Sequence, residues 1–258
     1  MKRIQDSDLH YYQSDLLAET RHGIFTRHGG VSKQPWSELN VGGTVGDDVQ
    51  AVRQNHQIMY DSLNVTAQNA CTSWQVHGAD VVMVDKPIHG RKWVARADGI
   101  MTNNPDTPLV MRYADCVPLL FHDPVKKVIG LAHAGWRGTV LGMGKNMILA
   151  MQNAYGSKAN DIQVVIGPSI SAEKFQVGEE VVSAVEAHFG TLDGLMKRDS
   201  HDGTAYVDLW EANRRDLHAI GVENIEISGI CTYQTTEDFF SHRAENGKTG
   251  RFGVVMQL

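Results

Sequence analysis

The chain has 258 residues, with 24 Lys and Arg against 30 Asp and Glu, which gives a formal net charge of −6. This balance argues against a protein that binds nucleic acid or an anionic membrane, because both need excess positive charge. Hydrophobic residues make up 42% of the chain, enough to bury a sizeable core, and this excludes disorder over the whole chain.

The first residues and the cysteines indicate the cytoplasm. The segment Met1–Asp8 becomes polar and acidic at once, unlike a signal peptide. The longest apolar stretches are far shorter than the ~20 residues of a membrane-spanning helix. Cys71, Cys116 and Cys231 are an odd number without Cys-x-x-Cys pairing, which favours reduced thiols. We therefore expect a cytoplasmic protein without membrane or nucleic-acid partners.

The first half of the chain predicts one helix and a hairpin. No linker, charge run or repeat divides the sequence, so we expect residues 1–258 to form one domain. Apolar residues at helical spacing, with Asp47 as N-cap, predict an amphipathic helix over 47–63. Two β-rich runs, 71–76 and 80–84, flank a short polar turn and predict a hairpin.

Three strands follow in quick succession, at 109–113, 117–122 and 128–132. The turn Asp123-Pro124 separates the second strand from the third. After Gly135 the apolar spacing changes to three and four residues, which predicts a helix over 138–155 and hence a strand-turn-helix unit.

The remaining elements complete the predicted fold class. They are a strand at 162–166, helices at 179–189 and 207–220, and strands at 225–231 and 252–258. Several strands follow one another without intervening helices. This pattern favours an α+β fold, in which mixed β-sheets pack against helices, over a doubly wound parallel sheet.

Three metal-capable residues stand at the ends of apolar strands: His77, Cys116 and His133. Their separations of 39 and 17 residues match no zinc finger, but a catalytic zinc site takes three ligands from separate elements and leaves the fourth position open. From spacing alone, half-buried histidines and a packed free cysteine are the simpler interpretation. No His-x-His pair occurs, which argues against a multicopper oxidase.

The segment 134–139 offers a candidate anion site. Its glycines would let the backbone approach a ligand, the N-terminus of the following helix attracts anions, and Arg137 adds a guanidinium fork. Phosphate and carboxylate both fit this description. The alternative is a glycine-rich turn in which Arg137 forms a surface ion pair.

Eight short motifs in order resemble the YfiH/YlmD-like laccase-domain family, from about residue 22 to the C-terminus. They are Thr26-Arg27-x-Gly29-Gly30-Val31-Ser32, Leu39-Asn40-x-Gly42, Gln75-Val76-His77-Gly78, Ala114-Asp115-Cys116-x-Pro118, His133-Ala134-Gly135-Trp136-Arg137-Gly138, Cys231-Thr232-Tyr233, Phe239-Phe240-Ser241 and Thr249-Gly250-Arg251. The His-Ala-Gly-Trp-Arg-Gly and Ala-Asp-Cys motifs are highly specific together.

The resemblance implies a mononuclear Zn²⁺ held by His77, Cys116 and His133. The same three residues would be the catalytic residues. It implies phosphorolysis of adenosine, inosine, guanosine and methylthioadenosine, and deamination of adenosine. The older family label, polyphenol oxidase or laccase, implies copper, which the missing His-x-His pair disfavours. Some bacterial relatives are described as peptidoglycan editing factors that remove misincorporated L-serine from a cell-wall precursor.

Two positions depart from the family pattern. Gln176 stands where members often have Glu, and Ala244 stands where they commonly have Arg. A carboxylate at the first position or a guanidinium at the second is therefore missing here.

Phosphorolysis requires an anionic nucleophile at C1′ of the ribose, so a chain of charge −6 needs a local positive pocket. We expect Arg137 to bind phosphate, with Arg53 and Asn40 as further phosphate or ribose contacts. Asp115 could transfer a proton or cap a strand end. The sequence specifies no oligomeric state.

Two other hypotheses stay open. In one, Cys116 is a nucleophile paired with His133 in a metal-free amide hydrolase that acts on the cell-wall precursor. In the other, the chain is a non-catalytic binding or scaffold protein.

Overall fold

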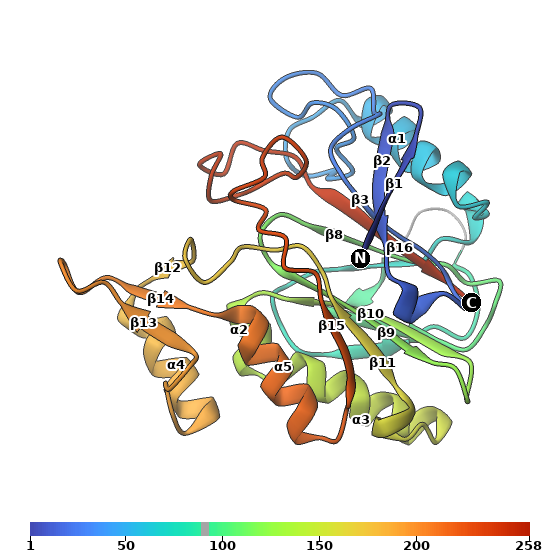
Figure 1. Ribbon diagram of the computed structural model, residues 1–258. Helices are drawn as coiled ribbons and strands as arrows, with labels where there is room; N and C mark the ends of the chain where they lie inside the picture. The colour runs from blue at the N-terminus through green and yellow to red at the C-terminus, as the bar shows by residue number, and fades with distance from the viewer. Residues whose placement is uncertain (89–92) are drawn as a thin grey trace.

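Two β-sheets form the centre of the computed structural model, which describes residues 1–88 and 93–258 (Figure 1). The first sheet is antiparallel, in the order β1 (Lys2–Asp6), β2 (Leu9–Gln13), β3 (Arg21–Phe25), β16 (Phe252–Gln257) and β8 (Leu109–Tyr113). The second sheet is mixed, in the order β15 (Asn224–Ile227), β11 (Gln163–Ile166), β9 (Val117–Asp123), β10 (Val128–Ala134), β7 (Gly99–Thr102) and β5 (Val81–Met83).

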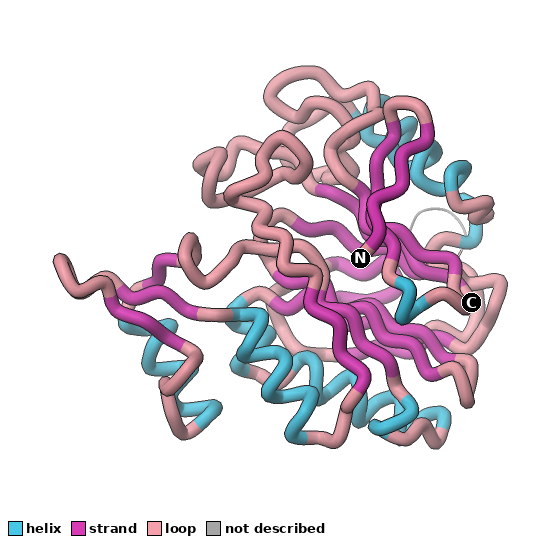
Figure 2. Tube along the Cα trace, viewed as in Figure 1, coloured by secondary structure: helices cyan, strands magenta, loops and turns pink. Residues whose placement is uncertain are grey.

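Two small sheets and the helices complete the described part of the chain (Figure 2). The small sheets comprise β12 (Gln176–Val177), β14 (Ala205–Val207) and β13 (Met196–Arg198), and the parallel pair β4 (Thr72–Trp74) and β6 (Trp93–Arg96). The α-helices are α1 (Val49–Ser62), α2 (Trp136–Val140), α3 (Met143–Tyr155), α4 (Glu179–Phe189) and α5 (Leu209–Ala219). Short 3₁₀ turns lie at Asp15–Leu17, Ala67–Asn69 and Ala159–Asp161. No described helix has the length and apolar character needed to cross a bilayer.

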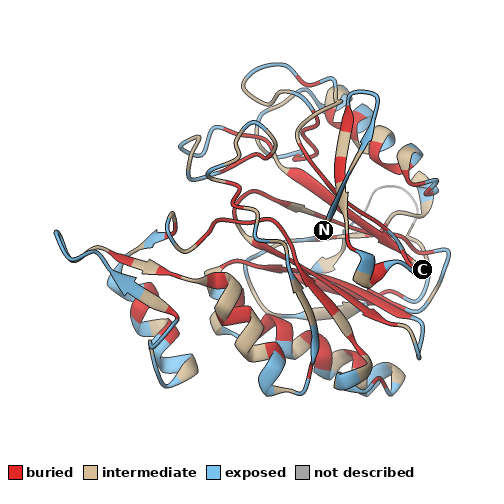
Figure 3. Ribbon diagram, viewed as in Figure 1, coloured by how far each residue is buried: buried red, intermediate tan, exposed pale blue. Residues whose placement is uncertain are grey.

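The central strands of the second sheet, β9, β10 and β7, are buried on both faces. On β9, Leu119 and Phe121 pack with residues of α3 and α5, whereas Leu120 packs with residues of the first sheet. Side chains alternate between the faces of a strand, so a strand covered on both sides reads as a continuous apolar run. On the outer face of the first sheet, Met59 of α1 packs with Phe25. The order of layers is therefore helix, sheet, sheet, helices (Figure 3).

The predicted α+β fold with mixed sheets is confirmed, and so is the helix predicted after Asp47, with one change at its start. The N-cap is Asp48, whose carboxylate accepts a hydrogen bond from the backbone N–H of Gln50 at 2.8 Å. The Asp47 carboxylate instead accepts from the side-chain amide of Asn40. Two adjacent aspartates can both serve as a cap, and tertiary contacts select between them.

The hairpin predicted around His77 is wrong. Strands β4 and β5 lie in different sheets, and each forms a parallel pair with another strand. The cause is a buried carboxylate: Asp98 accepts hydrogen bonds from the three consecutive backbone N–H groups of residues 76–78. The turn therefore forms around the Asp98 side chain, and the β-rich runs on either side of it do not pair with each other.

The helix predicted over 138–155 is divided into α2 and α3. Gly142 adopts a left-handed conformation, with φ of +74°, and this conformation ends the helical path. The strands predicted at 109–113, 117–122 and 128–132 correspond to β8, β9 and β10. The chain turn that joins β9 to β10 makes them antiparallel neighbours, with His133 opposite Pro118.

Candidate functional site

His77, Cys116 and His133 come together from three separate elements. His77 follows β4, Cys116 directly precedes β9, and His133 lies in β10. One potential ligand atom from each residue lies within 4.8 Å of the others. The two imidazole rings have centroids 5.0 Å apart and are nearly perpendicular. The structure thus unites the three residues that the sequence singled out.

Asp98 fixes the orientation of this cluster. Its Oδ1 lies 2.8 Å from Nδ1 of His133 and also accepts from the backbone N–H of His77 at 3.1 Å, while Oδ2 accepts from Gly78 at 2.7 Å. Burial opposes ionisation of Asp98, but the hydrogen bonds from His133 and Gly78 outweigh it, and the pKa of the carboxyl is lowered. An ionised carboxylate only accepts hydrogen bonds, so Nδ1 of His133 carries a proton and Nε2 is the ring nitrogen that a metal ion can bind.

Cys116 and His133 shift each other's pKa. Burial alone would raise the pKa of the Cys116 thiol, but His133 and His77 outweigh it and lower the pKa to about 6. Burial alone would lower the pKa of His133, but Cys116 and Asp98 raise it to about 9. Without a metal the pair therefore favours a thiolate beside an imidazolium. The thiolate is the form in which cysteine binds metals.

The donor set fits a catalytic metal ion. A thiolate and two imidazoles are ligands that zinc takes, and catalytic zinc sites have three protein ligands with the fourth position left for water or substrate. Within the part of the chain that the structure describes, no other His, Cys, Asp or Glu joins the group. The hydrogen bond from His133 to Asp98 is the second interaction that metal-binding histidines almost always make.

Gly135 and Gly138, in the segment predicted as an anion site, have a packing role in the structure. A Cβ atom at Gly135 would lie 2.9 Å from Sγ of Cys116, and one at Gly138 would lie 3.0 Å from the carbonyl oxygen of Gly78. The glycines therefore allow the chain after β10 to pack directly against the thiol and against the loop that carries His77.

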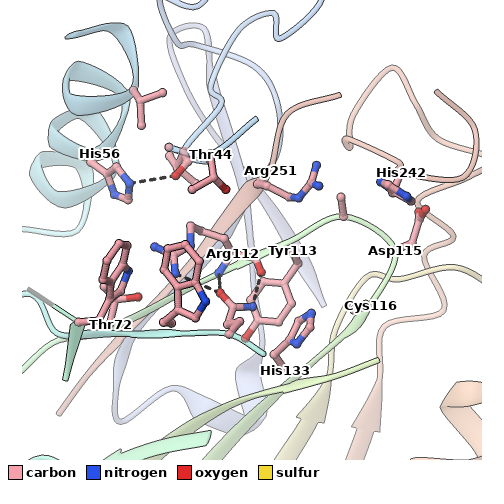
Figure 4. Close-up of a pocket in the computed structure, with 18 of the residues that line it drawn as sticks. Thr44, His56, Thr72, Arg112, Tyr113, Asp115, Cys116, His133, His242 and Arg251 are labelled. Carbon is pink, nitrogen blue, oxygen red and sulfur yellow. Dashed lines mark hydrogen bonds between the residues drawn. The ribbon is translucent and has the colours of Figure 1, made fainter. Parts of the chain in front are cut away.

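The cluster lies at a pocket of about 720 Å³ (Figure 4). Figure 4 shows Cys116 and Asp115 on one side of this pocket and His56 and Thr72 on the other. Arg251 and Arg112 lie between these two sides. The volume falls in the range of pockets that bind small molecules.

Of the three predicted substrate contacts, the pocket includes Arg53 and omits Asn40 and Arg137. Asn40 is fully buried, and its Oδ1 accepts hydrogen bonds from the backbone N–H of Gly42 and Arg251 at 2.9 and 2.8 Å. Asn40 therefore holds the segment that carries Arg251. The Arg137 guanidinium lies 4.3 Å from the centroid of the Trp136 ring, on the exposed side of the short helix α2.

Three arginines that were not among the predicted substrate contacts line the pocket, namely Arg243 and the more deeply buried Arg112 and Arg251. Burial lowers the pKa of Arg112 and Arg251. The hydrogen bonds of their guanidiniums go to neutral acceptors, such as the carbonyl oxygen of Ser73 at 2.8 Å from Arg112. The sequence held two signals for these pocket residues. One was a charged residue inside the apolar strand 109–113, and the other was the arginine of the Thr249-Gly250-Arg251 motif.

The pocket arginines have no carboxylate partner in the described chain. All arginine ion pairs there involve other residues, namely Arg3, Arg27, Arg198, Arg214 and Arg215. The pocket therefore concentrates positive charge in a protein whose net charge is −6. Such a pocket favours an anionic ligand.

Asp115 caps a loop, although it lines the pocket. Its Oδ1 accepts from the hydroxyl of Thr232 at 2.7 Å, and its Oδ2 accepts from the backbone N–H of Arg243 at 2.6 Å. The two departures from the family pattern, Gln176 and Ala244, are not among the pocket residues. Neither residue therefore forms part of the pocket wall here.

Comparisons with known proteins agree with the motifs. Residues 21–258 match the family model described as multi-copper polyphenol oxidoreductase laccase. The chain is 38% identical over 237 residues to "Purine nucleoside phosphorylase YlmD" of Bacillus subtilis, covering 89% of this chain and 85% of that protein. It is 31% identical to "Purine nucleoside phosphorylase" of Bacteroides thetaiotaomicron, covering 94% and 93% of the two chains. The crystal structure of YlmD from Geobacillus stearothermophilus is similar, with a TM-score of 0.92, 34% identity and coverage of 99% and 98%.

Proposed function

The chain belongs to the multi-copper polyphenol oxidoreductase laccase family, whose members include proteins named YlmD and YfiH, and from this premise we propose that it is a zinc-dependent purine nucleoside phosphorylase. In this reaction a phosphate oxygen forms a bond to C1′ of the ribose, and the bond from C1′ to the purine nitrogen breaks. The products are the 1-phosphate of the sugar, which is ribose 1-phosphate for adenosine, inosine and guanosine, and the free base, whose nitrogen takes up a proton. The names of the relatives support a reaction of nucleosides with phosphate.

One observation carries the proposal: the His77, Cys116 and His133 cluster shares a pocket with arginines that lack carboxylate partners. Phosphate is a multivalent anion that guanidinium groups bind through paired hydrogen bonds. Arg53 is exposed and has room to reorient, whereas Arg112 is held by neutral acceptors. We assign phosphate binding to Arg53, Arg112 and Arg251, in place of the predicted Arg137.

We assign His77, Cys116 and His133 as the residues that would hold Zn²⁺, which when bound supplies Lewis-acid chemistry that polarises an oxygen atom. The chain's own residues prepare this site. Asp98 keeps the proton of His133 on Nδ1, and the histidines keep Cys116 in its thiolate form. Asn40 positions Arg251 through its backbone N–H.

The proposed nucleoside substrates are adenosine, inosine, guanosine and methylthioadenosine, and the proposed second activity is hydrolytic deamination of adenosine. Deamination adds water at C6 of the base and releases ammonia, which converts adenosine to inosine. The support for both statements is the family membership together with a cluster that fits a catalytic metal.

The test is product identification after incubation of the purified protein with adenosine, with and without phosphate. Phosphorolysis gives adenine and ribose 1-phosphate only when phosphate is present. Deamination gives inosine in both cases, and both reactions in sequence give hypoxanthine. Failure to release any base from the four nucleosides in the presence of phosphate would refute the proposal.

A second candidate is a metal-free amide hydrolase, acting on a cell-wall precursor such as one with misincorporated L-serine. One observation favours it: Asp98, His133 and Cys116 form a chain in which a carboxylate orients an imidazole beside a thiolate. Metal analysis and alkylation separate the two candidates. A metal-bound thiolate is protected from iodoacetamide, whereas a free thiolate nucleophile of low pKa reacts quickly.

A further inference from the structure

Two tryptophans, Trp74 and Trp93, line the same pocket as the metal-capable cluster. Trp74 ends β4 and Trp93 begins β6, and these two short strands form a parallel pair. The indole rings have centroids 4.4 Å apart and an interplanar angle of 82°. In such an edge-to-face contact, the ring that presents its edge keeps both of its faces free of its partner.

The tryptophans are exposed although they line a concave surface. Trp74 is 37% exposed and Trp93 is 52% exposed. Val49, which is 54% exposed, lines the same pocket. Exposed apolar side chains gathered in one pocket mark a ligand-binding surface more often than isolated ones do.

We call Trp74 and Trp93 the aromatic wall of the pocket. Trp74 lies close to the cluster along the chain. Only Gln75 and Val76 separate Trp74 from His77, so their Cα atoms are at most about 11 Å apart. A nucleoside that bridges this span would place its base on the tryptophans and its ribose toward the cluster. The arginines that we assign to phosphate line the same pocket.

We infer that Trp74 and Trp93 bind the purine base of the nucleoside by stacking, an inference that rests on the proposed phosphorylase function. Stacking on indole recognises the face of a base and tolerates changes at its edge. The two-ring purines cover more of an indole than a pyrimidine does. The aromatic wall therefore selects purine over pyrimidine nucleosides without distinguishing strongly between adenine, guanine and hypoxanthine.

The experiment compares Trp74→Leu and Trp93→Leu with Trp74→Phe and Trp93→Phe in the full-length, metal-loaded protein. Leucine keeps apolar volume and removes the aromatic face, whereas phenylalanine keeps a face. Leu149→Ala, at an exposed apolar residue outside the pocket, is the control. Each variant is assayed for the KM of inosine, the KM of phosphate and the KM of ribose 1-phosphate in the reverse reaction.

The leucine variants should raise the KM of inosine by roughly 5-fold to 150-fold, the range that corresponds to loss of one base-stacking contact. Phenylalanine should restore most of the affinity. The KM of phosphate and of ribose 1-phosphate, which lack a base, should stay unchanged. An unchanged KM of inosine in both leucine variants would overturn the inference, as would equal increases for all three ligands.

Equilibrium binding of adenine separates this inference from the proposed function, because it needs no turnover. Binding by the wild type that weakens in the leucine variants supports the aromatic wall even if no nucleoside is cleaved. Failure of the wild type to bind adenine, or equal affinity in all variants, would overturn the inference. Cleavage of inosine together with equal adenine affinity in all variants would support the phosphorylase function and show that the tryptophans do not bind the base.

Discussion

The carboxylate of Asp98 lies 2.8 Å from Nδ1 of His133, and Asp98 itself is fully buried. The same carboxylate accepts the backbone N–H of His77. One side chain therefore sets the tautomer of one candidate metal ligand and the loop conformation of another. The arrangement makes Asp98 the positioning residue of the site, since it holds His133 and the His77 loop without lining the pocket itself.

Asp98→Asn should weaken zinc binding by about 10-fold to 100-fold, as expected when the hydrogen-bond partner of a metal-binding histidine is changed. The asparagine amide offers only one accepting oxygen, and its NH₂ group would face backbone N–H groups that also donate. Zinc affinity can be measured by competition with a chelator. Asp216→Asn is the matched control, because Asp216 bonds His188 at 2.9 Å outside the site. Equal zinc affinity in the two variants would contradict the role of Asp98.

Gly135→Ala should reduce zinc occupancy without unfolding the protein. The added Cβ would lie 2.9 Å from Sγ of Cys116, so the thiol must move away from the histidines. Zinc content after dialysis and the thermal unfolding midpoint measure the two effects. At Gly43, an added Cβ meets nothing within 4 Å, so Gly43→Ala should retain its zinc. Full occupancy in Gly135→Ala would show that the thiol position is not critical.

Arg53→Met should raise the KM of phosphate by about 10-fold or more, which is the size expected for loss of a hydrogen bond to a charged group. Methionine keeps much of the apolar stem and removes the charge. Arg137→Met serves as the comparison, because its guanidinium lies over Trp136 and outside the pocket. A larger effect from Arg137 than from Arg53 would restore the assignment that the sequence alone favoured.

Metal-free protein should react with iodoacetamide at Cys116 at a rate that rises as pH increases through about 6, because this is the pKa at which the reactive thiolate forms. The rate should then level off near neutral pH. Cys71 is an internal control, since burial raises the pKa of its thiol. Mass spectrometry of the alkylated peptides separates the two sites. Added zinc should suppress the reaction at Cys116, and a half-maximal rate near pH 9 would contradict the influence of the histidines.

The fold class was predictable from the sequence because the central strands of the sheets are buried on both faces. Strands β8, β9 and β10 appear as apolar runs bounded by turns, and their positions agree with the prediction. The prediction of a hairpin around His77 was wrong because the turn is formed by hydrogen bonds to Asp98, a residue 21 positions further along the chain. Local patterns of residues carry no information about such a distant acceptor.

The metal-capable residues were predictable from motifs, and the pocket wall was only partly so. Arg53 was anticipated, but Arg112 was hidden inside an apolar strand, and Arg251 belonged to a motif without an assigned role. From the sequence alone, Arg137 was the stronger candidate for phosphate binding than Arg112 or Arg251, because it lies at a glycine-rich start of a predicted helix. In the structure its guanidinium lies over Trp136 on the exposed side of α2 and does not line the pocket.

The most direct test of the whole account measures zinc content and inosine phosphorolysis together in the wild type, in Cys116→Ser and in chelator-treated protein. We predict about one zinc per chain in the wild type, loss of both zinc and activity in Cys116→Ser, and recovery of activity when zinc is returned to the chelated wild type. Full phosphorolysis in metal-free protein, or a full zinc complement in Cys116→Ser, would contradict the account.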